Sequence, residues 1–293
     1  MKILRAATLT VADLMRSTEL YGEWLDYAQI EGGDISRSLA ESWGCPAVAG
    51  RPYAVMQPAS GADVFLRFIE QPPRPDYVPL TSYGWAAIEI CVQDVLAVNE
   101  RMLKSPFEII GPPREIEGLP AIHPMQVKGP DGEIVYLTHI KDDLPGYDLP
   151  RAGSLIDKLF IVVMACSDLD ASKAWIKEHA AVTPGRDMEI VYTMIANAFS
   201  LPMEDLHRIA TMIHDRDVFL ELDQLPPAAT PRPSHDGMLP PCAAIGTLIH
   251  PEFDALPGRW ITAPEIREGA IYQNKRAATL SAPDGTLIEI VEA

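Results

Sequence analysis

The chain has 293 residues, enough for two domains that each bury a core, and its 47% hydrophobic content is typical of a packed protein, not of a disordered one. Its net charge of −17 makes nucleic acids and anionic membrane surfaces poor partners, because like charges repel. The acidity is most simply explained as a way of staying soluble.

The cysteines and the N-terminus predict a cytoplasmic protein. The four cysteines form no Cys-x-x-Cys pair, and three of them lie in or beside apolar runs, where a free thiol behaves as a small hydrophobe. The first residues show no apolar signal core with a cleavage site. No apolar run approaches the roughly 20 residues that a membrane helix needs.

The first quarter of the chain predicts a strand, a helix and two further strands. Asp13 is a good N-cap, and Leu14, Thr18, Tyr21 and Leu25 follow at helical spacing. The expected strands are 4–11, 53–56 and 64–69, with a short helix within 36–45 and a stiff proline-rich connector at 72–79.

The pattern then restarts three times. The second quarter predicts strands at 85–92, 125–128 and 134–140, a helix at 95–102 after Asp94, and a linker at 142–153. The second half predicts strands at 159–165, 206–213, 218–222, 242–249, 276–281 and 287–291, a helix at 169–178 after Asp168, and a second proline-rich connector at 226–241.

Two stretches occur twice, which indicates an internal duplication. DVFLRFIEQPP at 63–73 matches DVFLELDQLPP at 217–227, with an offset of 217 − 63 = 154 residues. GPDGEIVYLTHI at 129–140 matches APDGTLIEIVEA at 282–293, with an offset of 153. In the first pair, Arg67 stands where the second copy has Glu221.

These elements predict an α+β fold of four βαβββ units. A unit this small cannot cover its own sheet, so the units are expected to pack in pairs. We expect one domain at 1–141, from units 1–72 and 80–141, and another at 154–293, from units 154–226 and 240–293, each with a cupped sheet.

The chain resembles the vicinal oxygen chelate superfamily of glyoxalases, bleomycin-resistance proteins and extradiol dioxygenases. The stretch TLTVADLMRSTELYGEWL (8–25) is similar to that family's first strand, capping aspartate and helix. The stretches GPDGEIVYL (129–137) and APDGTLIEI (282–290) are similar to its turn and last strand. The resemblance implies paired βαβββ units that curl into cups. Each cup would bind a divalent metal through a first-strand His and a last-strand Glu from each unit.

The ligands implied by the resemblance are largely missing here. The family's first-strand ligand lies seven residues before the capping aspartate, which gives Ala6, Ala87 and Ile161 here. The fourth unit, aligned by its apolar run, gives Ala244. The last-strand positions are Arg67, Tyr136, Glu221 and Glu289. Two carboxylates in the C-terminal cup allow a weak Mg²⁺ or Ca²⁺ site at Glu221 and Glu289, but no tight iron, zinc or nickel site.

Glu221 and Glu289 are the candidate catalytic pair. In one apolar cleft, burial and mutual repulsion would raise one pKa and give a general base beside a general acid. The alternative is that both carboxylates are structural or exposed. His207, which aligns with Tyr53, is a candidate proton shuttle or a structural histidine.

Arg67 is the candidate substrate-binding residue of the N-terminal cup. It would grip an anionic substrate opposite Tyr136, or else pair with an inward acid such as Glu89. Thr8 lies on the same inward strand face as Ala6 and would add a hydroxyl, and Tyr53 and Glu89 are further candidate substrate-binding residues.

The leading functional hypothesis is an enzyme of lyase or isomerase type that acts on a small apolar or aromatic molecule through carboxylate chemistry. The alternatives are a metal-free binding or sequestering protein and a dioxygenase-like metalloenzyme with ligands elsewhere. A homodimer is compatible with the sequence.

Overall fold

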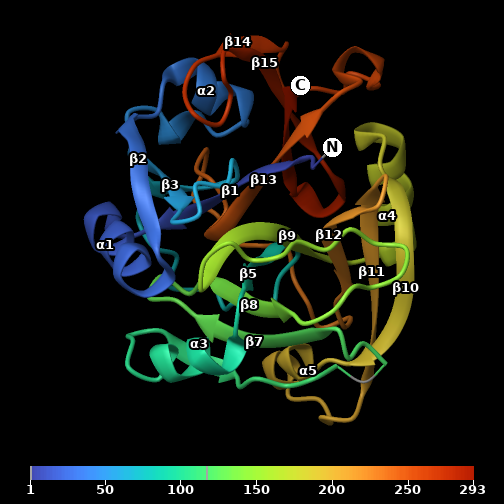
Figure 1. Ribbon diagram of the computed structural model, residues 1–293. Coiled ribbons are helices and arrows are strands. Elements are labelled where there is room, and N and C mark those ends of the chain that lie inside the picture. Colours follow the sequence, from blue (N-terminus) through green and yellow to red (C-terminus); the bar gives the residue numbers. More distant parts are fainter. Residues whose placement is uncertain (1, 117) are drawn as a thin grey trace.

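The structure is a computed structural model that describes residues 2–116 and 118–293. It contains two eight-stranded sheets, which confirms the α+β fold of four strand-rich units (Figure 1). Sheet 1 has the order β14-β15-β16-β13-β1-β4-β3-β2, and sheet 2 has the order β10-β11-β12-β9-β5-β8-β7-β6.

The strands of sheet 1 are β1 (Leu4–Val11), β2 (Tyr27–Asp34), β3 (Pro52–Pro58), β4 (Phe65–Glu70), β13 (Cys242–His250), β14 (Glu265–Arg267), β15 (Lys275–Ser281) and β16 (Leu287–Glu292). Those of sheet 2 are β5 (Gly84–Val92), β6 (Glu108–Gly111), β7 (Ile122–Lys128), β8 (Ile134–Ile140), β9 (Ile156–Cys166), β10 (Thr183–Val191), β11 (Leu206–His214) and β12 (Asp217–Gln224). The helices are α1 (Leu14–Leu25), α2 (Arg37–Ser42), α3 (Val95–Met102), α4 (Leu169–Ala180) and α5 (Thr193–Phe199).

The four units pair differently from the expectation. β1 pairs antiparallel with β13, so the first and fourth units form sheet 1. β5 pairs antiparallel with β9, so the second and third units form sheet 2. The division into self-contained halves at 1–141 and 154–293 is therefore wrong for the sheets. The sequence does not distinguish the two pairings, because each unit offers the same first-strand edge to whichever neighbour reaches it.

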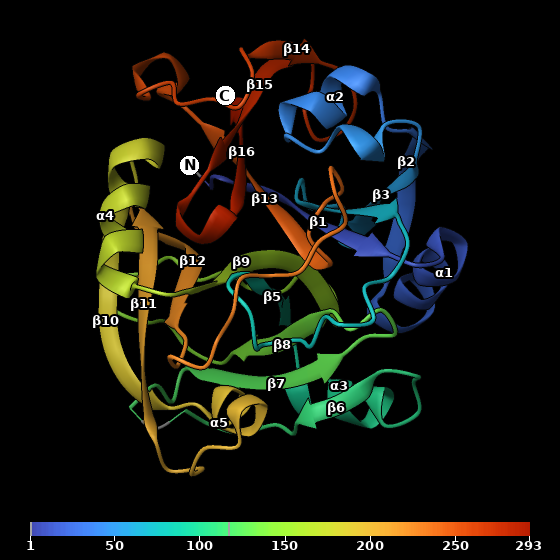
Figure 2. The same ribbon diagram turned by 180° about the vertical axis from the view of Figure 1, so that it is seen from behind.

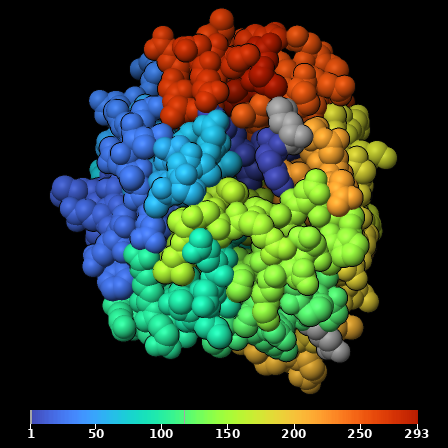
Figure 3. All heavy atoms as spheres, viewed as in Figure 1, coloured from blue at the N-terminus to red at the C-terminus, as the bar shows by residue number. Residues whose placement is uncertain are grey.

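Both proline-rich connectors carry the chain from one sheet to the other. The first runs from β4 in sheet 1 to β5 in sheet 2, and the second runs back from β12 to β13. The two lie side by side, joined by a bridge between Ser82 and Thr230. In the space-filling view, the last quarter of the chain lies at the top with the first quarter beside it on the left, and the second quarter lies below them (Figure 3).

The capping aspartates behave as the sequence predicts. The side chains of Asp13, Asp94 and Asp168 each accept hydrogen bonds from backbone N–H groups of the following turn, which satisfies donors that have no partner within the helix. The helices α1, α3 and α4 start directly after these residues. Of the described helices, none is long and apolar enough to cross a membrane.

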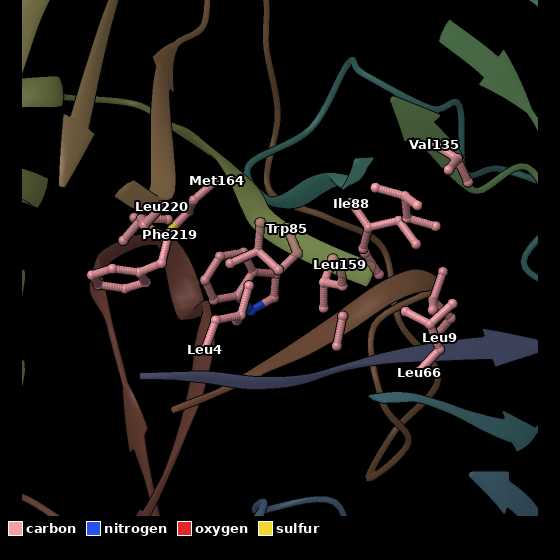
Figure 4. Close-up of a cluster of buried hydrophobic side chains, with 14 of the residues drawn as sticks. Leu4, Leu9, Leu66, Trp85, Ile88, Val135, Leu159, Met164, Phe219 and Leu220 are labelled. Atoms are coloured by element: carbon pink, nitrogen blue, oxygen red, sulfur yellow. The ribbon is translucent and has the colours of Figure 1, made fainter. Parts of the chain in front are cut away.

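The sheets pack back to back through their outer faces. Leu4 and Leu9 of β1 belong to the same buried cluster as Leu159 of β9 and Trp85 of β5 (Figure 4). The Trp85 indole donates to the Leu287 carbonyl of the other sheet at 2.8 Å. The concave faces are therefore turned away from each other, with α2 above one and α5 beside the other (Figures 1 and 2).

Candidate functional site

The concave face of sheet 1, which we call cup 1, brings four residues into one row. Parallel register places Thr8 beside Arg67 and Thr247 beside Glu289. The antiparallel pair of β1 and β13 sets Ala6 opposite Thr247 and joins the two halves of the row. The N-terminal and C-terminal units thus share a single floor.

Glu289 is the centre of this floor and is 1% exposed. Its Oε1 accepts hydrogen bonds from the Trp43 indole at 2.8 Å and the Tyr272 hydroxyl at 2.9 Å. Its Oε2 accepts from Thr247 Oγ1 at 2.9 Å and from Arg67 Nη2 at 3.2 Å. With four donors, this carboxylate has its acceptor capacity filled.

Arg67 is the counter-ion of Glu289 and is equally buried. Its Nε donates to Thr8 Oγ1 at 2.9 Å and its Nη1 to the Tyr272 hydroxyl at 2.5 Å. The guanidinium carbon lies 4.6 Å from the centre of the Trp43 ring, within cation–π range. Because each charge has its opposite, the floor of cup 1 is electrically neutral without any bound ion.

A cavity of about 320 Å³ opens above this floor. Arg67 and Tyr272 form part of its wall, and α2 and the strand β14 lie along its sides. The other lining residues are Glu31, Asp34, Ile35, Ser36, Ser38, Leu39, Tyr53, Val55, Ile266, Arg267, Glu268 and Ile271.

Glu31 and Tyr53 organise one side of the cavity. The Tyr53 hydroxyl donates to Glu31 Oε1 at 2.8 Å, and Glu31 Oε2 accepts from the Ala270 backbone at 2.6 Å. Burial and the Glu31 carboxylate together raise the pKa of Tyr53 to about 12, so the phenol stays protonated. Glu31 thereby ties the edge strand β2 to the loop that carries Tyr272.

The concave face of sheet 2, cup 2, holds a different set of groups. Register places Glu89 beside Tyr136 and Val163 beside Glu221, with Asp223 two residues further along the same face. Tyr192 donates to Glu221 Oε1 at 3.3 Å and shares a 2.5 Å contact with the Tyr136 hydroxyl. Thr138 donates to Glu89 Oε1 at 2.5 Å.

The carboxyls of cup 2 have raised pKa values. Burial, aided by Glu221, raises the pKa of Glu89 to about 8. Burial also raises the pKa of Glu221, and burial together with Glu221 raises that of Asp223 well above its usual range. None of the ion pairs among the described residues includes these three carboxyls. Glu89 therefore keeps its proton at neutral pH, and all three carboxyls hold protons to a higher pH than exposed carboxyls do.

His207 lies outside both clusters. It is buried at the start of β11, opposite Ile190 of β10, and lines a separate open hollow of about 410 Å³ with Arg208, Leu225 and their neighbours. Burial lowers its pKa, so the ring is neutral at pH 7. The described contacts of His207 include neither Glu221 nor Glu289.

Three expected groupings are wrong. Glu221 and Glu289 lie in different sheets, so they cannot act as one pair or hold one metal ion. Arg67 does pair with an inward acid, but with Glu289 and not with Glu89. Tyr136 stands beside Glu89 in cup 2, away from Arg67. All three errors have one cause. The prediction paired the first unit with the second and the third with the fourth, whereas the first pairs with the fourth and the second with the third.

The first-strand positions were also misplaced. The residues beside the last-strand positions are Thr8, Glu89, Val163 and Thr247, two or three positions after the expected ones. Asp223 could have been identified from the sequence, because it follows Glu221 at strand spacing. Trp43 and Tyr272 could not, because they come from a short helix and a loop without periodic pattern.

The donor set of either cup is a poor fit for the metal that the resemblance implies. In cup 1 a guanidinium occupies one of the four positions, and only one carboxylate faces it. In cup 2 the positions carry two carboxyls, a phenol and a valine. Across the part of the chain that is described, no three His, Cys, Asp or Glu side chains are arranged to hold a metal ion.

Comparison with known proteins identifies the fold. No protein-family model matches the sequence, and no curated protein matches it. Among solved structures, glyoxalase I from Zea mays is similar over 99% of this chain and 92% of its own, with a TM-score of 0.63 and 17% identity. A candidate dioxygenase from Bacillus subtilis is similar over 99% of this chain and 85% of its own, with a TM-score of 0.62 and 11% identity. The chain therefore has the tandem fold of the glyoxalase and dioxygenase proteins, with an ion pair at the floor of one cup and a carboxyl cluster in the other.

Proposed function

We propose that the chain binds a small, partly apolar or aromatic molecule in cup 1, without a metal ion. The observation that carries the proposal is the 320 Å³ cavity above the neutral Arg67–Glu289 floor. Sites for small molecules are typically concave, apolar-walled and supplied with a few polar groups. Ile35, Leu39 and Val55 supply apolar wall here.

The charges of the wall favour a neutral ligand over an anion. Arg67 already has Glu289 as its counter-ion, and the other arginine of the wall, Arg267, lies 3.4 Å from Glu265 and donates to Ser38. Glu31, Asp34 and Glu268 also line the cavity. An anion entering here would meet these carboxylates without meeting an unpaired Arg67. The remaining N–H groups of Arg67 can still donate to a carbonyl or hydroxyl oxygen of a neutral molecule.

The test is a ligand-observed NMR screen of small neutral aromatic and carbonyl fragments, run with EDTA. Leu39→Trp places a large side chain at the cavity wall and should abolish the hits. Leu206→Trp is the matched control, because Leu206 lines the separate hollow near His207. Hits that survive Leu39→Trp, or that need an added metal ion, would overturn the proposal.

A second candidate function is proton-transfer chemistry of lyase or isomerase type in cup 2. It is favoured by the Glu221–Asp223 pair, in which one carboxyl can remove a proton from a carbon while the other returns one elsewhere. Deuterium incorporation into small hydroxyketones in D₂O would support it if Glu221→Gln abolished the exchange. Exchange that persists in that variant would count against it.

A further inference from the structure

Arg267 is a buried cation in the wall of the cup 1 cavity. It is 8% exposed and ends β14, the edge strand at the far side of sheet 1 from β2. Its side chain reaches α2, where Nη1 donates to Ser38 Oγ at 3.3 Å and Nη2 donates to the Ser38 carbonyl at 3.2 Å. Arg267 therefore connects the two sides of the cavity.

The hydrogen bonds of Arg267 leave one of its donors without a partner. Nη2 also donates to Glu265 Oε2 at 3.4 Å, but the Glu265 side chain is 55% exposed, so solvent weakens this ion pair. The Nε atom is buried and has no hydrogen-bond partner among the described residues. A buried N–H group that donates to nothing is costly, and such groups are rare in native proteins.

Arg67, the other arginine of the cavity, shows the contrast. Each of its three nitrogens donates to a described acceptor, on Thr8, Tyr272 and Glu289 respectively. The hydrogen bonding of the floor is thus complete, whereas that of the wall is not. A ligand that supplies an acceptor oxygen would gain most by placing it at Arg267.

The guanidinium group of Arg267 is held loosely enough to turn toward a ligand. Its three hydrogen bonds measure 3.2, 3.3 and 3.4 Å, whereas N–H···O bonds in proteins are usually about 2.9–3.0 Å long. A small rotation within these long bonds would present the Nε–H group to the cavity that Arg267 lines.

The surroundings of Arg267 indicate what kind of acceptor fits there. Leu39 and Ile271 line the same cavity and offer apolar contact. A carboxylate or phosphate would be repelled by three further lining residues, Glu31, Asp34 and Glu268. A carbonyl oxygen brings no net charge and accepts well from a guanidinium N–H group. The combination favours a neutral carbonyl compound with an apolar body.

We propose that Arg267 determines which ligands cup 1 selects, by donating from Nε to the carbonyl oxygen of a neutral aromatic ketone. The inference rests on the proposed binding function of cup 1. The apolar part of the ketone would lie against Leu39 and Ile271. A molecule of the same shape without the oxygen would leave the Nε–H group unpaired, and the site would discriminate against it for that reason.

The test compares the binding of three probes at pH 7 in the presence of EDTA, by NMR titration. The probes are acetophenone, α-methylstyrene, in which a CH₂ group replaces the carbonyl oxygen, and the anion benzoate. Acetophenone should bind about tenfold or more tightly than either of the others. Equal affinities for acetophenone and α-methylstyrene, or tighter binding of benzoate, would overturn the role of Arg267 while cup 1 remained a binding site. Binding of none of the three would overturn both proposals.

Two substitutions separate the Nε donor from the charge. In Arg267→Lys the ammonium group can still reach Ser38 but no N–H group stands at the Nε position, and Arg267→Met removes the charge as well. Both variants should lose the tenfold preference for acetophenone and still bind α-methylstyrene. A preference that survives in both would overturn the proposal. Loss of α-methylstyrene binding in both would also overturn it, because Arg267 would then only shape the cavity.

Arg37→Met is the matched control. Arg37 precedes Ser38 on α2, its side chain is 80% exposed, and it is not among the residues that line the cavity. This variant should keep the preference for acetophenone. Loss of the preference in Arg37→Met would mean that the overall charge near α2, and not the Arg267 donor, selects the ligand.

Discussion

At the residue scale, the exchange of one glutamate for Arg67 governs cup 1. Its duplicate position carries Glu221, and both side chains project from the same point of a last strand. A guanidinium there needs a buried partner, and Glu289 of the other unit supplies it. The result is an internal ion pair that joins the first and last quarters of the chain.

Removing one member of this pair should be costly. Glu289→Gln leaves Arg67 buried without a counter-ion, and we expect a loss of about 3–5 kcal/mol in the free energy of unfolding, measured by urea denaturation. The double variant Arg67→Met with Glu289→Leu removes both charges and should recover most of the loss. A single variant within about 1 kcal/mol of the wild type would mean that the pair is not essential to the floor.

At the element scale, some elements were predictable and others were not. The capped helices α1, α3 and α4 follow from an aspartate and apolar residues at helical spacing. The edge strands β2 and β10 were missed, because Gly32-Gly33 interrupts one and exposed polar residues dominate both. The helix α5 was missed since it lacks a cap and is too short to show a period.

The shared caps allow a prediction that can be checked on one helix. Asp94→Ala removes the acceptor for the N–H groups of Leu96 and Ala97, and it should lower the free energy of unfolding by about 1 kcal/mol. Asp94→Asn keeps an acceptor and should lose less. Equal losses for the two variants in thermal unfolding would show that charge, not capping, is the main contribution.

At the scale of the whole molecule, the two sheets depend on a close contact. The Trp85 ring packs against Gly246, where an added Cβ would lie 2.7 Å from the ring. Gly246→Ala should therefore destabilise the protein by about 1–3 kcal/mol through overpacking, as seen in the midpoint of chemical denaturation. An unchanged midpoint would mean that the contact between the Trp85 ring and Gly246 does not limit the stability of the protein.

The protonated carboxyls predict an unusual dependence of stability on pH. Glu89, and Glu133 beneath α1, have folded-state pKa values of about 8, above the value of about 4.3 for an unfolded glutamate. The native state then binds more protons than the unfolded state, so stability is greatest below the unfolded pKa and falls as pH rises through the folded one. Each pH unit between the two values removes about 1.4 kcal/mol per carboxyl.

This pH dependence of stability is tested by urea denaturation of Glu89→Gln between pH 5 and pH 9, in steps of about one pH unit. The variant should lose less stability with rising pH than the wild type. The exposed Glu100→Gln serves as the control and should follow the wild-type curve. A Glu89→Gln curve parallel to that of the wild type would contradict the assignment.

The sequence did not reveal which of the four units pair to form each sheet. Arg67 and Glu289 were expected on cup floors from the family resemblance, and the two side chains meet on the floor of cup 1. Which inward faces share a cup depends on contacts between β1 and β13, some 240 residues apart, and no local pattern encodes them.

The central claim, that cup 1 binds a small molecule without a metal ion, is tested most directly by the indole N–H signals of the five tryptophans. Trp43 touches the floor of cup 1, and Trp43→Phe assigns its signal. In the presence of EDTA, bound neutral fragments should shift the Trp43 signal and leave those of Trp85 and Trp175 in place. Fragments that bind while leaving Trp43 unshifted, or that shift it only after a divalent metal is added, would contradict the claim.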